Sequence, residues 1–165
     1  NNPYCQDNEI SWFDWSLTKS NADILAFVKK LIRLRKQHPV FSRSEFLTGV
    51  QSGDRHKQDI SWYDAQGNAP DWNQSSSFLA YFLDGSAAET RAERDDNSFY
   101  IILNSGSLDI TATICQPPQG KYWHRLIDTS YPAGEDFANP EQAPLLENQQ
   151  KYVVLAATAV VLILK

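Results

Sequence analysis

Residues 98–115 read SFYIILNSGSLDITATIC and contain the clearest fold signal in the chain. Residues 98–104 form a nearly continuous apolar run rich in β-branched and aromatic side chains, which indicates a strand. Ser-Gly-Ser at 105–107 is typical of a turn, and beyond it Ile110, Ala112 and Ile114 alternate with threonines. Such alternation is typical of a strand with one buried and one solvent-facing side. The stretch therefore predicts two strands of an antiparallel sheet.

Short apolar runs of the same kind lie on both sides of this stretch. Turn-forming residues separate them, and they occupy residues 60–63, 78–83, 123–127, 151–155 and 158–164. We interpret residues 86–97 as an exposed charged loop, and the segment that contains Pro132, Pro140 and Pro144 as a long loop. Seven or eight strands at this spacing predict a mainly β fold, an antiparallel, Greek-key-like β-sandwich over residues 43–165.

One helix is expected before the β-rich part, between Ser20 and His38. Its apolar residues recur at spacings of three and four, as in an amphipathic helix: Ile24, Phe27, Val28, Leu31, Ile32 and Leu34. Ser20 or Asn21 could cap its first turn, and several cations occupy its last turns, where the helix dipole favours positive charge. Because a residue before proline avoids the α conformation, we expect the helix to stop at His38–Pro39.

Composition and charge limit the classes of partner. The chain has 165 residues, 42% of them hydrophobic, which suffices for one domain with a core. A net charge of −5 argues against a nucleic-acid partner, because phosphate binding requires a basic surface. The cationic side of the helix is interpreted as a solvated face. The apolar run at 152–164 is short for a membrane span, so no membrane partner is expected.

The cysteines and histidines predict no metal site and no cofactor. Cys5 and Cys115 are far apart, and the three histidines are scattered along the chain. Two isolated cysteines fit a reducing compartment better than an oxidising one, so we expect a cytoplasmic location. The sequence contains no methionine and opens abruptly on Asn1. We therefore expect it to be a piece of a longer chain.

Three motifs resemble parts of one enzyme family. YCQDNEISWFDW at residues 4–15 resembles a segment of bacterial isoamylases and glycogen debranching enzymes, which belong to the α-amylase superfamily of glycoside hydrolases. AFVKKLIRLRKQHPVF at 26–41 is similar to the final helix of their catalytic (β/α)₈ barrel, and DISWYDAQGNAPDW at 59–72 to the start of their C-terminal β-sandwich. The resemblance implies that residues 1–42 end the barrel and that residues 43–165 form the C-terminal domain.

The resemblance also implies an activity for the whole protein. These enzymes hydrolyse α-1,6-glucosidic branch points in glycogen or similar α-glucans with retention of configuration. In the family the catalytic carboxylates precede the segment that matches Tyr4, so this chain is expected to be non-catalytic. Its expected partners are the missing catalytic barrel and, through the parent enzyme, an α-glucan such as glycogen or a maltooligosaccharide.

Loop residues near the N-terminus are the first candidates for substrate contact. Loops that follow barrel strands face the active site, so we predict that the parent's cleft is lined by Tyr4, Gln6, Asp7 and Asn8. The alternative is that these residues only fix the loop or cap the helix. Trp12 and Trp15 are interpreted as packing residues between barrel and sandwich.

The sandwich itself has two candidate roles. Aromatic faces can stack on glucose rings, which would make the domain a carbohydrate-binding module with a platform formed by Trp62, Trp72 and Trp123, to which Tyr131 could add. Alternatively, the sandwich is structural and covers the apolar helix face that belongs against the barrel. In that case the face either folds back onto the sandwich or stays exposed in this chain. We favour the structural role.

Overall fold

The computed structural model describes residues 6–50, 58–86 and 95–165. Within these ranges the chain forms two α-helices, two 3₁₀-helices and seven strands. The helical elements are α1 (Leu17–Ser20), α2 (Ala22–Gln37), η1 (Pro39–Phe41) and η2 (Pro140–Gln142). The strands are β1 (Ile60–Tyr63), β2 (Phe78–Leu83), β3 (Phe99–Asn104), β4 (Ile110–Thr113), β5 (Trp123–Asp128), β6 (Lys151–Val154) and β7 (Thr158–Leu164).

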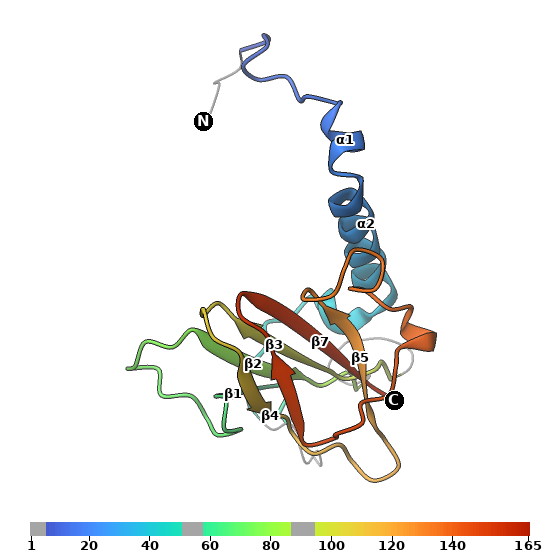
Figure 1. The fold of residues 1–165 in the computed structure, drawn as a ribbon. Helices are drawn as coiled ribbons and strands as arrows, with labels where there is room; N and C mark the ends of the chain where they lie inside the picture. The colour runs from blue at the N-terminus through green and yellow to red at the C-terminus, as the bar shows by residue number, and fades with distance from the viewer. Residues whose placement is uncertain (1–5, 51–57, 87–94) are drawn as a thin grey trace.

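The strands form two antiparallel sheets. Five strands lie in the order β1-β2-β3-β7-β5, and β4 pairs with β6 in a second, two-stranded sheet (Figure 1). The chain leaves the larger sheet after β3 to form β4, and leaves it again after β5 to form β6. The predicted mainly β, antiparallel architecture is confirmed. Most of the predicted loop at 86–97 lies outside the described residues.

A first hydrophobic core fills the space between the two sheets. The larger sheet contributes Tyr100, Trp123 and Leu162, and the smaller one Ala112 and Val154, all with no exposed surface. Ala112 is buried while Thr111 before it is exposed, so β4 has the predicted alternation. A β-sandwich is stable because both sheets bury one face against each other.

A second core covers the opposite face of the larger sheet. Leu34 of α2 and Val40 of η1 pack there with Phe99, Leu126 and Phe137. Since β3 lies between two strands and is covered on both faces, its sequence is apolar almost throughout rather than alternating. The C-terminal end of α2 thus belongs to the fold of the sandwich, whereas the predicted domain boundary at residue 42 stays a prediction.

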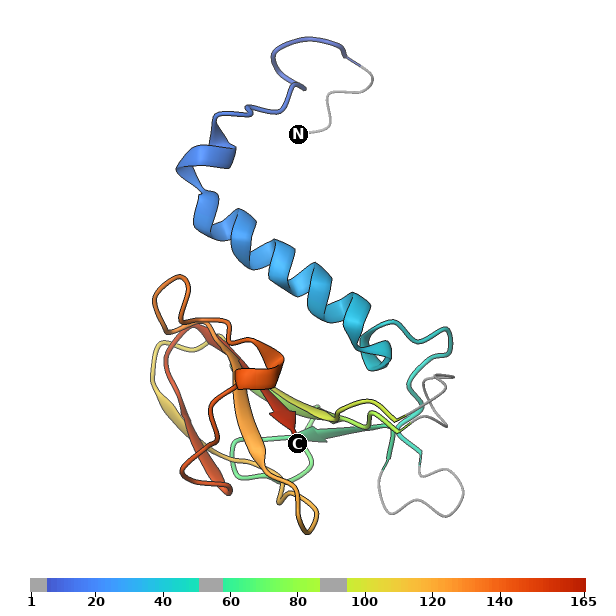
Figure 2. The same cartoon turned by 90° about the vertical axis from the view of Figure 1, so that its right-hand side faces the viewer.

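Helix α2 contacts the sandwich along one side, through Phe27, Lys30 and Leu34. Figures 1 and 2 show it rising from one side of the sheets, with the N-terminal segment beyond its far end. Leu34 is buried, whereas Ile24 near the other end is 60% exposed. The sequence left open whether the apolar face packs on the sandwich or stays exposed. Both occur, each on a different part of the helix. Among the helices that lie in the described ranges, none is long and apolar enough to cross a membrane.

The helix ends as predicted, but its start differs from the prediction. Gln37 is its last residue, and His38 before the proline has extended backbone angles. The predicted side-chain cap is wrong, since the Asn21 side chain makes no capping hydrogen bond. The short helix α1 leads directly into Asn21 and leaves its φ at −117° and ψ at 41°, outside the extended conformation that side-chain capping favours.

Candidate functional site

The predicted cleft residues form a compact turn beyond α1. The Asp7 carboxylate accepts a hydrogen bond from the Trp12 indole N–H at 2.7 Å, and Asn8 Oδ1 accepts one from the Ile10 amide at 3.1 Å. The Gln6 carbonyl accepts one from the Ser11 hydroxyl. Tyr4 lies outside the described residues. These bonds support the loop-fixing alternative for Asp7 and Asn8, and contact with substrate stays a prediction for all four.

Trp12 and Trp15 are largely exposed in this chain. Trp15 contacts Phe13 edge-to-face, with the ring centroids 5.1 Å apart. The segment before α1, which contains the turn and both tryptophans, lies away from the sandwich (Figure 2). Packing between barrel and sandwich stays a prediction.

Asp59, the first residue of the DISW motif, binds backbone groups inside the domain. Its buried carboxylate accepts hydrogen bonds from the backbone amides of Thr48, Gly49 and Ile60, each at 2.8 Å, and lies 3.7 Å from the Arg43 guanidinium. Burial alone would raise the pKa of Asp59, but the three amide donors outweigh it and hold the pKa below its ordinary value. Asp59 therefore ties the segment before β1 to the larger sheet and has a structural role.

The remainder of the motif forms turns. Asp64 Oδ1 accepts from the amides of Gln66 and Asn68, and Gly67 has a φ of +83°. A Cβ at Gly67 would lie 3.1 Å from the Thr113 side chain, so a close approach to β4 adds to the conformational reason for glycine. The motif therefore specifies the fold and supplies no cluster of reactive groups.

Two of the three predicted platform tryptophans lie together on the surface. Trp72 is 66% exposed and meets Trp62 edge-to-face at 5.7 Å, while Trp62 also contacts Tyr81 at 5.1 Å. Trp123 has no exposed surface and donates its indole N–H to the Cys115 carbonyl at 2.8 Å inside the first core. The prediction for Trp123 is wrong, because a buried ring offers no face to a sugar.

The tryptophan pair adjoins an apolar groove on the α2 side of the larger sheet. This groove has a volume of about 500 Å³ and is lined by Val40, Phe41, Leu47, Thr48, Gly49, Ile60, Trp62, Tyr81 and Leu83. Val40 and Phe41 belong to η1, which directly follows the α2 helix and His38. The groove therefore lies beside the end of the helix.

The exposed part of α2 has an apolar face of its own. Ile24, Val28 and Ile32 follow each other at intervals of four residues, so they lie on one side of the helix; we call them the exposed helix face. They neighbour the side from which Phe27 and Leu34 contact the second core. All three are substantially exposed, Ile32 at 52%. Such a row of large apolar side chains in water indicates an interface.

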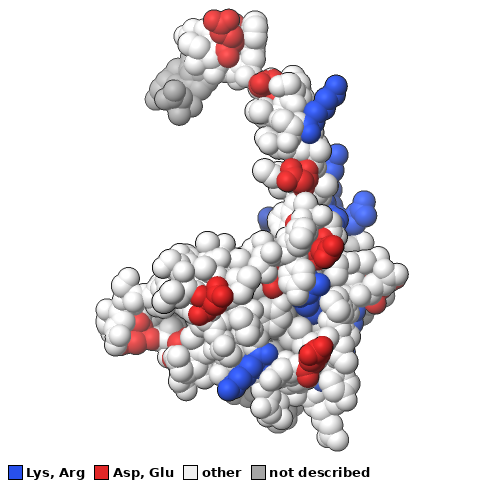
Figure 3. Space-filling model, in the orientation of Figure 1, with Lys and Arg blue, Asp and Glu red and all other residues white. Residues whose placement is uncertain are grey.

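Lysine and arginine side chains gather along another side of α2 (Figure 3). The solvated interpretation needs a correction at Lys30, which donates to the Phe137 carbonyl at 3.3 Å and lies 5.6 Å from the centre of that ring. Lys30 therefore helps to fix the helix on the sandwich. In the described part of the chain, no group of three or more His, Cys, Asp or Glu side chains could hold a metal ion.

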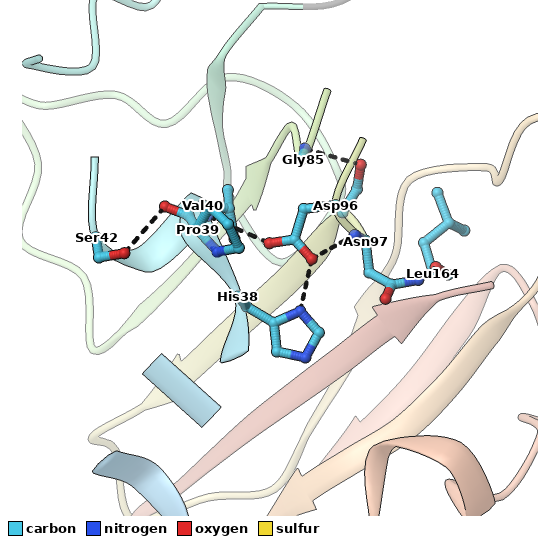
Figure 4. A network of polar contacts seen from close by, with 9 residues as sticks. His38, Pro39, Val40, Ser42, Gly85, Asp96, Asn97 and Leu164 are labelled. Atoms are coloured by element: carbon cyan, nitrogen blue, oxygen red, sulfur yellow. Dashed lines mark hydrogen bonds and ion pairs between the residues drawn. The ribbon is translucent and has the colours of Figure 1, made fainter. Parts of the chain in front are cut away.

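A polar network joins the end of α2 to the start of β3, and we call it the helix–sandwich junction. The Asp96 carboxylate accepts from His38 Nδ1 at 2.6 Å, from the Val40 amide at 3.2 Å and from the Asn97 amide at 2.7 Å (Figure 4). A carboxylate can only accept, so Nδ1 of His38 carries the proton. The side chains of His38 and Asp96 are only 11% and 8% exposed. Sequence reasoning missed this contact because it assigned Asp96 to an exposed loop.

A second groove, which we call the edge groove, lies between β5 and β6. Its volume is about 730 Å³, and residues of β5, β6 and the segments 130–132 and 144–148 line it. Arg125 lies over the ring of Tyr131, 3.9 Å from its centre, and Tyr152 donates to the buried Asp128 carboxylate at 2.6 Å. Apart from Tyr131, sequence reasoning named none of these residues as a site residue.

Comparison with known proteins identifies relatives over most of the chain. The family model described as "Isoamylase, C-terminal" matches residues 59–163. A glycogen operon protein GlgX homolog of Mycobacterium tuberculosis is 39% identical over 145 residues, which cover 82% of this chain and 20% of the relative. The isoamylase of Pseudomonas amyloderamosa is 32% identical over 133 residues, covering 78% of this chain and 16% of the relative. The chain thus spans only 16–20% of the length of these relatives.

Solved structures share the fold. The pullulanase from Bacillus acidopullulyticus superposes with a TM-score of 0.56 at 15% identity, over 93% of this chain and 15% of that one. Pullulanase type I from Bacillus subtilis superposes with a TM-score of 0.58 at 16% identity, over 93% of this chain and 17% of that one. At this identity the likeness concerns the fold alone. The family match over residues 59–163 and the identities of the relatives show that the chain belongs to the isoamylase C-terminal family.

Proposed function

We propose that this chain is the non-catalytic C-terminal part of an enzyme that hydrolyses α-1,6 branch points in glycogen or a similar α-glucan. The family membership supports the reaction class. Retaining hydrolysis requires two carboxylates about 5 Å apart in an enclosed sugar site, one as nucleophile and one as acid. Asp7, Asp14 and Glu9 are exposed in this chain, and the proposal assigns the catalytic pair to the remainder of the enzyme.

The role proposed for the chain is to dock against the catalytic barrel. The observation that supports it is the exposed helix face of Ile24, Val28 and Ile32, three large apolar side chains on a helix whose neighbouring side packs on the sandwich. The sequence of this helix resembles the last helix of the family's barrel, so the proposed occupant is the barrel itself. The nearby groove at Phe41 and Trp62 would extend the same interface. In this proposal Trp62 and Trp72 are packing residues.

The test introduces the same substitution, Val28→Asp, into the isolated chain and into the complete enzyme. In the isolated chain Val28 is exposed, so Val28→Asp should change the free energy of unfolding by less than about 0.5 kcal/mol. In the complete enzyme the new carboxylate would be buried without a partner, which should cost several kcal/mol and reduce debranching of amylopectin. Lys29→Asp, one residue along on the polar side, is the matched control and should have little effect in either setting.

Two results would contradict the proposal. If Val28→Asp and Lys29→Asp have equally small effects on the complete enzyme, the exposed helix face does not dock on the barrel. If the isolated chain releases reducing ends from amylopectin, the assignment of catalysis to the remainder of the enzyme is wrong. A cytoplasmic location is part of the same proposal, and fractionation of cells that express the complete enzyme tests it.

A further inference from the structure

We propose that the edge groove binds a short stretch of α-glucan chain, with Tyr131 as the stacking surface. The choice of an α-glucan rests on the proposed function, whereas the site and its chemistry rest on the geometry of the groove. The predicted tryptophan platform lies elsewhere, on the α2 side of the sheet, so this is a different surface from the one that the sequence indicated.

The groove is lined by one strand from each of the two sheets. β5 is the last strand of the larger sheet and β6 belongs to the two-stranded sheet, and the segments 136–138 and 144–146 hydrogen-bond along the outer side of β5. The segments 130–132 and 144–148 complete the lining of the groove. A volume of about 730 Å³ lies within the range of roughly 300–1,000 Å³ that is typical of ligand sites. An open groove, unlike an enclosed cavity, can accept part of a polymer.

The Tyr131 ring is held in one position by Arg125, which leaves it preorganised for stacking. The Arg125 guanidinium lies over one face of its ring, 3.9 Å from the centre, and the residue as a whole is 43% exposed. Arg125 is itself fixed, because its Nη1 donates to the Glu135 carbonyl at 3.1 Å. An aromatic ring with a fixed position loses little conformational entropy on binding. The face of a pyranose ring is apolar enough to pack on such a surface, while its hydroxyl groups point sideways.

The polar groups of the groove are arranged by internal hydrogen bonds. The buried Asp128 carboxylate accepts from the hydroxyl groups of Ser130 and Tyr152, both at 2.6 Å. Burial, followed by the hydrogen bond to Asp128, raises the pKa of Tyr152 well above its usual range, so its phenol keeps the proton. Asn148 Oδ1 accepts from the amides of Gln150 and Lys151, which orients the side-chain amide. Asn148 thus has a fixed side-chain amide in the lining of the groove, and its N–H groups can donate to hydroxyl groups.

The charges of the groove favour a neutral occupant. Arg125 and Lys151 are balanced by Asp128 and Glu147, so no excess charge selects an anion or a cation. A charge-balanced groove with an aromatic wall and several fixed polar groups matches a neutral, hydroxyl-rich chain.

The test is electrophoresis of the 165-residue chain in native gels that contain glycogen. The wild-type chain should be retarded, and free maltoheptaose should reverse the retardation. Tyr131→Ala should weaken apparent binding about fivefold to tenfold, the loss expected for one stacked ring. Tyr131→Phe keeps the ring and should bind nearly as well as wild type. Trp72→Ala, which removes a more exposed aromatic ring from another surface, should bind unchanged.

Several outcomes would overturn the inference. They are an unretarded wild-type chain, equal binding by wild type and Tyr131→Ala, and a loss of binding in Trp72→Ala alone. Because Tyr131 is exposed, Tyr131→Ala should still unfold cooperatively at the wild-type temperature, and this check excludes misfolding as the cause of a loss. Debranching by the complete enzyme is a separate measurement. If debranching occurs but the chain binds no glycogen, only this inference fails; without debranching activity, the proposed function fails.

Discussion

Replacing Asp96 with alanine tests the helix–sandwich junction most directly. The carboxylate accepts three hydrogen bonds, from His38 Nδ1, the Val40 amide and the Asn97 amide, at 2.6–3.2 Å. Hydrogen bonds to a charged group contribute about 1.5–3 kcal/mol each, but the two backbone amides can recover part of this by binding water. We expect Asp96→Ala to lower the free energy of unfolding by about 3 kcal/mol.

The measurement is urea unfolding of the 165-residue chain, with thermal unfolding beside it. A loss of 3 kcal/mol in a protein of this size corresponds to a decrease in Tm of about 6–12 °C. The slope of the free energy with urea should not change, because the same surface is exposed on unfolding. Hydrogen exchange should identify the site, since the amides of Val40 and Asn97 lose their acceptor and should exchange faster.

Asp71→Ala is the matched control. Asp71 also accepts three hydrogen bonds, two from Asn73 and one from Gln74, but its carboxylate is exposed in a turn. Water can replace those bonds, so this variant should lose less than about 1 kcal/mol. If the two variants lose equal stability, or if Asp96→Ala loses less than about 1 kcal/mol, the junction does not fix α2 on the sandwich.

Three further predictions concern the sandwich. The folded pKa of Asp59 lies below its ordinary value of 3.8, so its carboxylate stabilises the fold above that pH, and the contribution disappears as the pH falls through the folded pKa. The stability difference between wild type and Asp59→Asn, measured by urea unfolding, should therefore be largest near neutral pH and shrink below pH 3.8. Trp123→Ala should cost about 3–5 kcal/mol in the same assay, because it leaves a cavity in the first core; an unchanged midpoint would contradict its complete burial. Gly67→Ala should cost more than about 1 kcal/mol because of its positive φ and the Thr113 contact, whereas Gly120→Ala, with a positive φ but open space, should cost less.

Local sequence patterns predicted most of the elements but not how they pair. The run at 98–104 and the alternation at 110–114 correspond to β3 and β4. The end of α2 was predicted because a residue before proline avoids the α conformation. The position of β7 between β3 and β5 depends on contacts between residues more than 30 positions apart, which no local pattern describes. For the same reason the pairing of two sheets of unequal width, and the groove between them, could not be predicted.

The candidate sites show the same limit at the level of single residues. Trp123 starts a strand whose register shifts between Arg125 and Ile127, so its alternation is interrupted and does not show which side chains are buried. Arg125, Tyr131 and Tyr152 meet only because β5 and β6 lie at one edge of the sandwich. The family resemblance, by contrast, could be recognised from the sequence alone, because it depends on local motifs rather than on contacts between distant residues.

The place of β7 in the larger sheet has a consequence for how the protein folds during synthesis. As the ribosome makes the chain from its N-terminus, β5 emerges with no strand of its own sheet to pair with, and one edge of β3 remains open. Until residues 158–164 leave the exit tunnel, these unpaired edges can bind other nascent chains. Stop codons before residue 158 should therefore yield aggregating products rather than a smaller stable domain.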